Sequence, residues 1–194
     1  LHAEALVFFS DYENMHGNCT ASQSCDDDNI GNQYNGGEVE VKGLELKIGN
    51  EFTVANYTVP VDLTYTYTAT KFLNSFESAL DTWGDVEAGD ELPYVPENQL
   101  QFSAGLVGEK WRGDIVVRYM DKMRTSAGQS TYSEAGIDSR TVIDMAAHYD
   151  IAKNQTVSLN VDNLLDEEYV STKTHGSIMV GKPRSLTIGY SYSF

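Results

Sequence analysis

The chain has 194 residues, and its 29 acidic and 13 basic residues give it a formal net charge of −16. This charge argues against a nucleic-acid partner, because a protein that binds nucleic acid needs a basic face. No apolar run approaches the about 20 residues that a transmembrane helix requires, so a helical membrane protein is excluded. No signal peptide opens the chain.

The predicted elements are β-strands, because apolar and polar residues alternate with a period of two along most of the chain. Near the C-terminus, for example, Leu186 and Ile188 fall on one face and Thr187 on the other. A slip of this alternation by one residue at Gly43 predicts a β-bulge. The chain starts at Leu1 in the middle of the pattern, so we expect it to be part of a longer protein. In chain order, the predicted strands cover residues 1–13, 37–50, 58–71, 97–108, 111–124, 139–151, 155–164 and 183–194.

The connections between these strands are alternately long and short. The long or medium ones are 14–36, 72–96, 125–138 and 165–182, and the short ones are 51–57, 109–110 and 152–154. An up-and-down transmembrane barrel has this alternation, whereas a soluble sandwich has no reason to place every long loop at one end. Aromatic residues gather near the short turns, as in an interfacial girdle: Phe52, Tyr57, Trp111, Tyr149, Tyr192 and Phe194. The predicted fold class is therefore all-β, an antiparallel up-and-down transmembrane β-barrel.

The two cysteines, Cys19 and Cys25, lie six residues apart in the polar segment 14–36. This spacing predicts a disulfide that closes a small ring, and a disulfide implies an oxidising compartment. The alternatives are two free thiols or half of a metal site. A zinc site is disfavoured because the sequence offers neither a Cys-x-x-Cys pair nor a histidine partner.

Two stretches near the C-terminus resemble the closing signature of TonB-dependent receptors. The first is Asn160–Tyr169, with the sequence NVDNLLDEEY, and the second is Gly181-Lys182-Pro183-Arg184, followed by a strand that ends in an aromatic residue. The chain departs from the family at Leu165, where phenylalanine is usual. Further upstream, Lys42-Gly43-Leu44-Glu45 and Phe8-Phe9-Ser10-Asp11-Tyr12 are similar to the ferric-citrate branch of the family.

The resemblance implies a receptor in the outer membrane of a Gram-negative bacterium that imports a ferric chelate, either ferric citrate or a siderophore. Such a receptor has a barrel of about 22 strands filled by an N-terminal plug. Residues 1–194 then correspond to about eight C-terminal strands, with the plug absent and no cofactor. The TonB complex acts through that absent N-terminal part, and lipid and lipopolysaccharide surround the barrel. Alternative ligands are cobalamin, haem or a carbohydrate, and a complete eight-stranded structural or adhesive barrel is an alternative of another class.

Four cations are the candidate ligand-binding residues. Between 111 and 124 the membrane-facing set is Ile115, Val117 and Tyr119. Alternation then places Arg118, Lys122 and Arg124 on the lumenal side, and Arg140 of the next strand shares that side. A stripe of cations on a concave wall would attract an anionic chelate. The alternative is that these cations pair with acidic residues of the plug or with Asp144 and Asp150.

No catalytic group of residues is recognised, so the protein is not expected to be an enzyme, and no resident metal site is predicted. The histidines are scattered along the chain, at positions 2, 16, 148 and 175. The outer segments are acidic and include Asp26–Asp28, Glu77, Asp81, Asp85, Glu87, Asp90 and Glu91. These carboxylates could hold divalent cations beside lipopolysaccharide, or they could simply be solvated.

Overall fold

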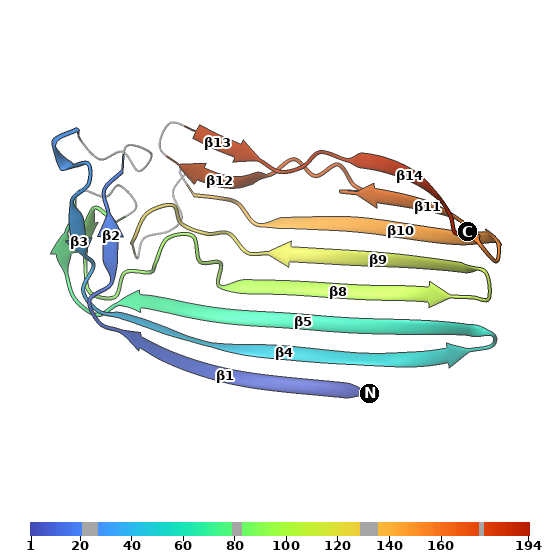
Figure 1. Ribbon diagram of the computed structural model, residues 1–194. Helices are drawn as coiled ribbons and strands as arrows, with labels where there is room; N and C mark the ends of the chain where they lie inside the picture. Colours follow the sequence, from blue (N-terminus) through green and yellow to red (C-terminus); the bar gives the residue numbers. More distant parts are fainter. Residues whose placement is uncertain (21–26, 79–82, 129–135, 175–176) are drawn as a thin grey trace.

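The computed structural model describes residues 1–20, 27–78, 83–128, 136–174 and 177–194. Eight long strands form one antiparallel sheet whose strand order follows the chain (Figure 1). The strands are β1 (His2–Tyr12), β4 (Val39–Val54), β5 (Tyr57–Phe72), β8 (Asn98–Val107), β9 (Trp111–Met120), β10 (Arg140–Ala152), β11 (Gln155–Asp162) and β14 (Ser185–Tyr192). The prediction of eight antiparallel strands is confirmed.

The predicted alternation of long and short connections is also confirmed. The short turns 55–56, 108–110 and 153–154 lie at one end of the sheet, together with both termini, and the long connections lie at the other end (Figure 1). In their described parts, the long connections carry three small hairpins and a short 3-10 helix, Asp27–Asn29. The hairpins pair β2 (His16–Asn18) with β3 (Gln33–Asn35), β6 (Phe76–Glu77) with β7 (Asp85–Val86), and β12 (Val170–Thr174) with β13 (Ser177–Val180). We call the end with the long connections the loop end.

One face of the sheet is apolar, and the register explains why. Leu63 lies opposite Ile48 on one side and Phe102 on the other, and cross-strand partners point to the same face. Ile188, on the last strand, is 72% exposed. A row of exposed aliphatic residues is the surface that a barrel presents to lipid. At the short-turn end the ring centroids of Tyr57 and Trp111 are 5.5 Å apart, where the aromatic residues were expected.

The predicted β-bulge at Gly43 is wrong. Gly43 pairs with Phe8 on one side and with Thr68 on the other, and neither register shifts there. The apolar pattern slips for a different reason: Val39 does not belong to the exposed apolar row of the sheet. Its side chain is 1% exposed because it packs beneath the long connections.

The buried core lies at the loop end. Its members are buried apolar side chains from β4, β5 and two long connections: Cys19, Val39, Phe72, Trp83 and Val86. The ring of Phe76 stacks edge-on against both Phe72, at 5.5 Å, and Trp83, at 5.6 Å. Aromatic edge-to-face contacts add to the free energy of apolar burial. The connections 13–38 and 73–97 are therefore anchored to the ends of β4 and β5.

The sheet is open, with β1 and β14 as its two edges. Both strands lie within the described residues, and they do not pair with each other. A complete eight-stranded barrel would require that pairing. The structure thus counts against the small structural or adhesive barrel. Within the part of the chain that the structure describes, no helix is long and apolar enough to cross a membrane.

Candidate functional site on the polar face

The face opposite the apolar row is polar, and two of the four predicted cations meet there. Arg118 on β9 lies between Gln101 of β8 and Val142 of β10, and Arg140 lies opposite Met120. Alternation along adjacent strands therefore places both guanidinium groups on the polar face, as predicted for Arg118 and Arg140.

These two arginines line a cavity of about 370 Å³, which we call the polar hollow. Four of its other lining residues are threonines and glutamines from β5 and β8: Thr64, Thr66, Gln99 and Gln101. Hydroxyl, amide and guanidinium groups all donate hydrogen bonds. The polar hollow is thus a concave surface with many donors, suited to a ligand that carries oxygen acceptors.

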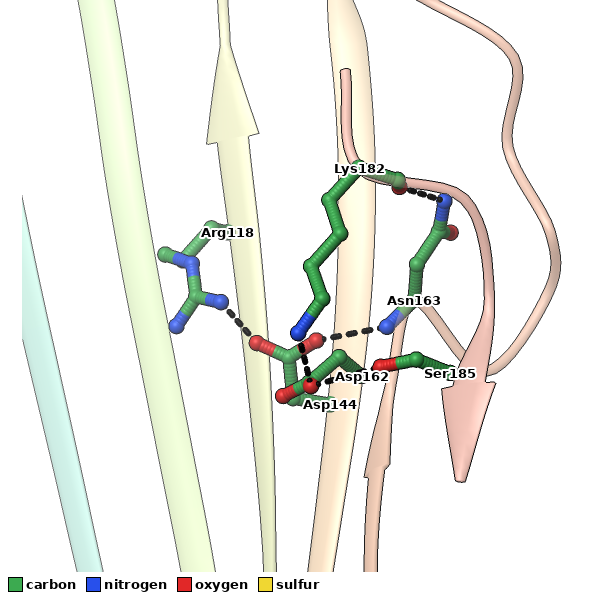
Figure 2. A network of polar contacts seen from close by, with 6 residues as sticks. All are labelled: Arg118, Asp144, Asp162, Asn163, Lys182 and Ser185. Carbon is green, nitrogen blue, oxygen red and sulfur yellow. Dashed lines mark hydrogen bonds and ion pairs between the residues drawn. The ribbon is translucent and has the colours of Figure 1, made fainter. Parts of the chain in front are cut away.

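Asp144 holds Arg118 in place at the wall of the polar hollow. The Arg118 Nη2 atom forms an ion pair with Asp144 Oδ2, and Asp144 Oδ1 accepts a hydrogen bond from the backbone N–H of Asn163 at 2.8 Å (Figure 2). The two oxygens of one carboxylate therefore connect β9, β10 and the end of β11. This pairing matches the alternative in which wall carboxylates neutralise the cations.

Arg140 is held by neutral groups at the loop end of the polar hollow. Its guanidinium carbon lies 5.1 Å from the centroid of the Tyr169 ring, a cation–π geometry. Its Nη1 donates to the carbonyl of Val170 at 3.2 Å, and its Nη2 lies 3.0 Å from the sulfur of Met120. Arg140 therefore fixes the first part of the connection 163–184.

Lys122 and Arg124 do not join the other two cations. Strand β9 ends at Met120 rather than at the predicted residue 124, so the alternation that placed these residues on the lumenal side does not reach them. The Arg124 side chain is 10% exposed, and its Nε forms an ion pair with Glu91 at 2.8 Å in the connection 73–97. Neither Lys122 nor Arg124 is among the described residues that line the polar hollow. Ligand binding by any of the four remains a prediction.

Asn163 is a structural residue whose role the sequence reasoning missed. It is 2% exposed and has a φ of 52°, a left-handed conformation that asparagine tolerates better than most residues. Its side-chain amide donates to the carbonyls of Glu167, at 2.9 Å, and Lys182, at 3.0 Å, and its side-chain oxygen accepts from the Glu167 N–H at 2.9 Å. The position of Asn163 in the receptor-like motif was the available signal.

The network around Asn163 continues through the preceding residue (Figure 2). Asp162 pairs with Lys182 Nζ at 2.5 Å and accepts from the Ser185 hydroxyl at 2.9 Å, so both ends of the connection 163–184 are tied to β11. The residues that carry the family resemblance thus fasten the last strand to its neighbour.

A second polar cluster lies at the loop end of β8 and β9. Asp121 accepts hydrogen bonds from Asn98 Nδ2 at 2.9 Å, from the Lys122 N–H at 2.9 Å and from the Tyr119 hydroxyl at 3.2 Å. Burial alone would raise the pKa of Asp121, but these donors outweigh it, and the pKa falls below its ordinary value. Asp121 therefore stays ionised and caps the end of β9.

The remaining candidates on the long connections are only partly described. Cys19 is 1% exposed in the buried core, and Cys25 lies outside the described residues, so the disulfide stays a prediction. Asp26, Asp81 and His175 also lie outside the described residues. Among the residues that the structure does describe, no group of three or more histidine, cysteine, aspartate or glutamate side chains could hold a metal ion.

Comparisons with known proteins agree with this architecture. The metal-pseudopaline receptor of Pseudomonas aeruginosa is 26% identical over 179 residues, which cover 88% of this chain and 23% of that protein. The vitamin B12 transporter of Photobacterium profundum is 24% identical over 138 residues, covering 71% of this chain and 19% of that protein. This chain therefore spans about a quarter or less of the length of these relatives.

Solved structures show the same fold. The ferric-catecholate import receptor of Escherichia coli superposes with a TM-score of 0.68 at 22% identity, over 99% of this chain and 25% of that one. The pyoverdine receptor of Pseudomonas aeruginosa, solved with pyoverdine bound, gives a TM-score of 0.64 at 18% identity, over 98% of this chain and 27% of that one. The family described as "TonB dependent receptor-like, beta-barrel" matches residues 1–164. Since this match covers most of the 194 residues, the chain belongs to the TonB-dependent receptor β-barrel family.

Proposed function

We propose that this chain forms part of the barrel of an outer-membrane receptor that takes up an anionic metal chelate, and that the chelated metal is iron. The observation that supports this proposal most directly is the polar hollow, where Arg118 and Arg140 line one cavity together with amide and hydroxyl donors. Guanidinium groups bind carboxylates through two parallel hydrogen bonds, and a concave wall of low dielectric strengthens their field.

The named relatives support a metal chelate as the cargo. Two of them name a metal chelate in their descriptions, one as a metal-pseudopaline receptor and the other as a ferric-catecholate import receptor. Carboxylate-rich chelates such as ferric citrate fit two guanidinium groups best. The ferric-citrate branch remains part of the proposal, as do the drive from the TonB complex, the contact with lipid and lipopolysaccharide, and the location in a Gram-negative outer membrane.

Cobalamin is the second candidate, because one relative is a vitamin B12 transporter. The two candidates make different demands on the polar hollow. A carboxylate chelate needs the guanidinium charges, whereas cobalamin, whose ring carries neutral amide side chains, needs hydrogen-bond partners more than positive charge. Competition of cyanocobalamin with labelled ferric citrate, measured on the same receptor preparation, would discriminate between them.

The experiment is ferric citrate binding to the full-length receptor that carries this segment, with Arg118→Ala, Arg140→Ala and Arg140→Lys. A hydrogen bond to a charged group contributes about 1.5–3 kcal/mol, or roughly one to two decades in affinity. We expect that loss for Arg140→Ala and a smaller one for Arg118→Ala, because Arg118 already pairs with Asp144. Arg140→Lys keeps the charge and should recover part of the affinity.

Arg112→Ala is the matched control. Arg112 is on the same face of β9 and pairs with Asp114 at 2.8 Å, but it lies at the short-turn end, away from the polar hollow. Its removal should leave the dissociation constant unchanged. Unchanged affinity in both the Arg118→Ala and Arg140→Ala receptors would move the ligand site to other strands.

A further inference from the structure

We propose that Asp144 is a specificity-determining residue that sets the charge the polar hollow presents to a ligand. In this proposal, which rests on the proposed function above, Asp144 competes with a bound anion for Arg118. The Asp144 carboxylate already neutralises Arg118. A ligand can therefore bind Arg118 only if it displaces Asp144 from that ion pair.

The geometry makes Asp144 a fixed competitor. One of its oxygens pairs with Arg118, and the other accepts the Asn163 N–H at 2.8 Å (Figure 2). Asn163 itself is 2% exposed, and both the nitrogen and the oxygen of its side-chain amide form hydrogen bonds. The backbone N–H that it donates to Asp144 is therefore held in position. Since the carboxylate is anchored there, an incoming anion must draw Arg118 away from Asp144 rather than shift the pair together.

The two arginines therefore differ in availability. Arg140 contacts a carbonyl, a thioether sulfur and an aromatic ring, all of them neutral. Arg118 contacts a carboxylate. The two guanidinium groups are the charged side chains that line the polar hollow, and Asp144 neutralises one of them from outside the lining through its ion pair with Arg118. A ligand with one carboxylate is matched by Arg140 alone, and further carboxylates must compete with Asp144 for Arg118.

A purely structural role for Asp144 makes a different prediction. If Asp144 only anchored Asn163, then asparagine at 144, which keeps an oxygen acceptor for that N–H, would behave like the native residue. If Asp144 sets the charge, then the same substitution frees Arg118 and strengthens the binding of anions. Asp144→Asn separates the two roles, because it removes the charge and keeps the acceptor.

Asp114→Asn is the matched control variant. Asp114 lies on the polar face of β9, next to β10, and like Asp144 it pairs with an arginine, in this case Arg112 at 2.8 Å. Its partner Arg112 is not among the residues that line the polar hollow, whereas Arg118, the partner of Asp144, is. The control removes one negative charge from the same wall, so any effect of the overall charge of the barrel would be equal in the two variants.

The test uses the full-length receptor in detergent and two measurements. The first is the rate at which phenylglyoxal labels Arg118, followed by peptide mass spectrometry. The second is the dissociation constant for ferric citrate, with the uncharged chelate ferrichrome as a comparison, at low and high salt. Asp144→Asn should label severalfold faster at Arg118 and should bind ferric citrate about two- to fivefold more tightly, the range for a half-exposed ion pair. The gain should shrink at high salt, and ferrichrome should not respond.

Several results would overturn the proposal. Unchanged labelling of Arg118 in Asp144→Asn would mean that Asp144 does not hold it. Faster labelling without tighter ferric citrate binding would remove the effect on specificity. An equal gain in affinity in Asp114→Asn would also remove it. So would the finding that neither the native receptor nor Asp144→Asn binds ferric citrate. Failure of the proposed function is recognised separately, because Arg118→Ala and Arg140→Ala would then both leave ferric citrate affinity intact.

Discussion

Replacing Asn163 by alanine should weaken the attachment of the connection 163–184, and with it of the last strand β14, to β11. The substitution removes three hydrogen bonds made by a side chain that is 2% exposed. These bonds hold the carbonyls of Glu167 and Lys182 and the N–H of Glu167. Glu167 and Lys182 are themselves exposed residues, so water can replace part of these bonds and the net value per hydrogen bond applies.

The expected magnitude follows from the bonds and the backbone. Each bond contributes about 0.5–1.5 kcal/mol net, so the three together contribute roughly 1.5–4.5 kcal/mol. Alanine at a φ of 52° adds about 1 kcal/mol, because only glycine and asparagine adopt the left-handed region readily. We expect Asn163→Ala to lower the free energy of unfolding by about 3–5 kcal/mol. Asn163→Gly should cost about 1 kcal/mol less, since it loses the bonds but keeps the backbone conformation.

The assay is guanidinium unfolding of the full-length receptor in detergent, with the heat-modifiable fraction on a gel as a second readout. Asn160→Ala is the matched control, because Asn160 belongs to the regular part of β11 and is only partly buried. Its substitution should change the free energy of unfolding by less than about 0.5 kcal/mol. Equal midpoints for Asn163→Ala and Asn160→Ala would refute the idea that this side chain fastens the last strand.

Three further predictions concern the loop end. Gly181→Ala would drive its new methyl group into the Tyr169 ring, so the heat-modifiable fraction should fall and should recover when Tyr169→Ala is added. The lowered pKa of Asp121 stabilises the fold above the ordinary aspartate pKa of about 4, and this stabilisation is lost as pH falls through the lower, folded-state pKa. Unfolding midpoints between about pH 6 and 3 should therefore decline more steeply in the native receptor than in Asp121→Asn; parallel curves would contradict this. Peptide mapping without reductant should find Cys19 joined to Cys25, and two free thiols would exclude the disulfide.

The eight strands could be predicted from the sequence because one face of the sheet is apolar and the other is polar, and this difference imposes a period of two. The ends of the strands were harder to predict. The strand β4 runs to Val54, past the predicted end at residue 50, because Glu51 and Phe52 still pair with β5 after the apolar row ends. In contrast, β9 stops at Met120. The Asp121 N–H still donates to the carbonyl of Asn98, but the N–H of Lys122 donates to the Asp121 carboxylate instead of to a neighbouring strand. Backbone hydrogen bonding, which the alternation does not encode, decides both ends.

The candidate site was half predictable for a related reason. Parity along a strand placed Arg118 and Arg140 on one face, and the structure confirms it. The alternation of side chains along a strand could not reveal which carboxylate pairs with Arg118, because that depends on the register between β9 and β10. Arg124 lies in an irregular segment, where no period applies, and its partner Glu91 comes from another long connection.

The polar hollow and the connection 163–184 share their anchors, and this changes how binding data on the receptor should be read. Arg118 reaches the connection through Asp144 and the Asn163 N–H, and Arg140 reaches it through the Tyr169 ring and the backbone beyond. Removing either guanidinium therefore changes both the charge of the hollow and the hold on the connection. A substitution that keeps the charge but loses the fork, such as Arg140→Lys, separates these effects, because lysine still attracts an anion but cannot make the same planar contacts. If Arg140→Lys and Arg140→Ala lose equal affinity, then the connection, rather than the charge, is what the ligand requires from Arg140.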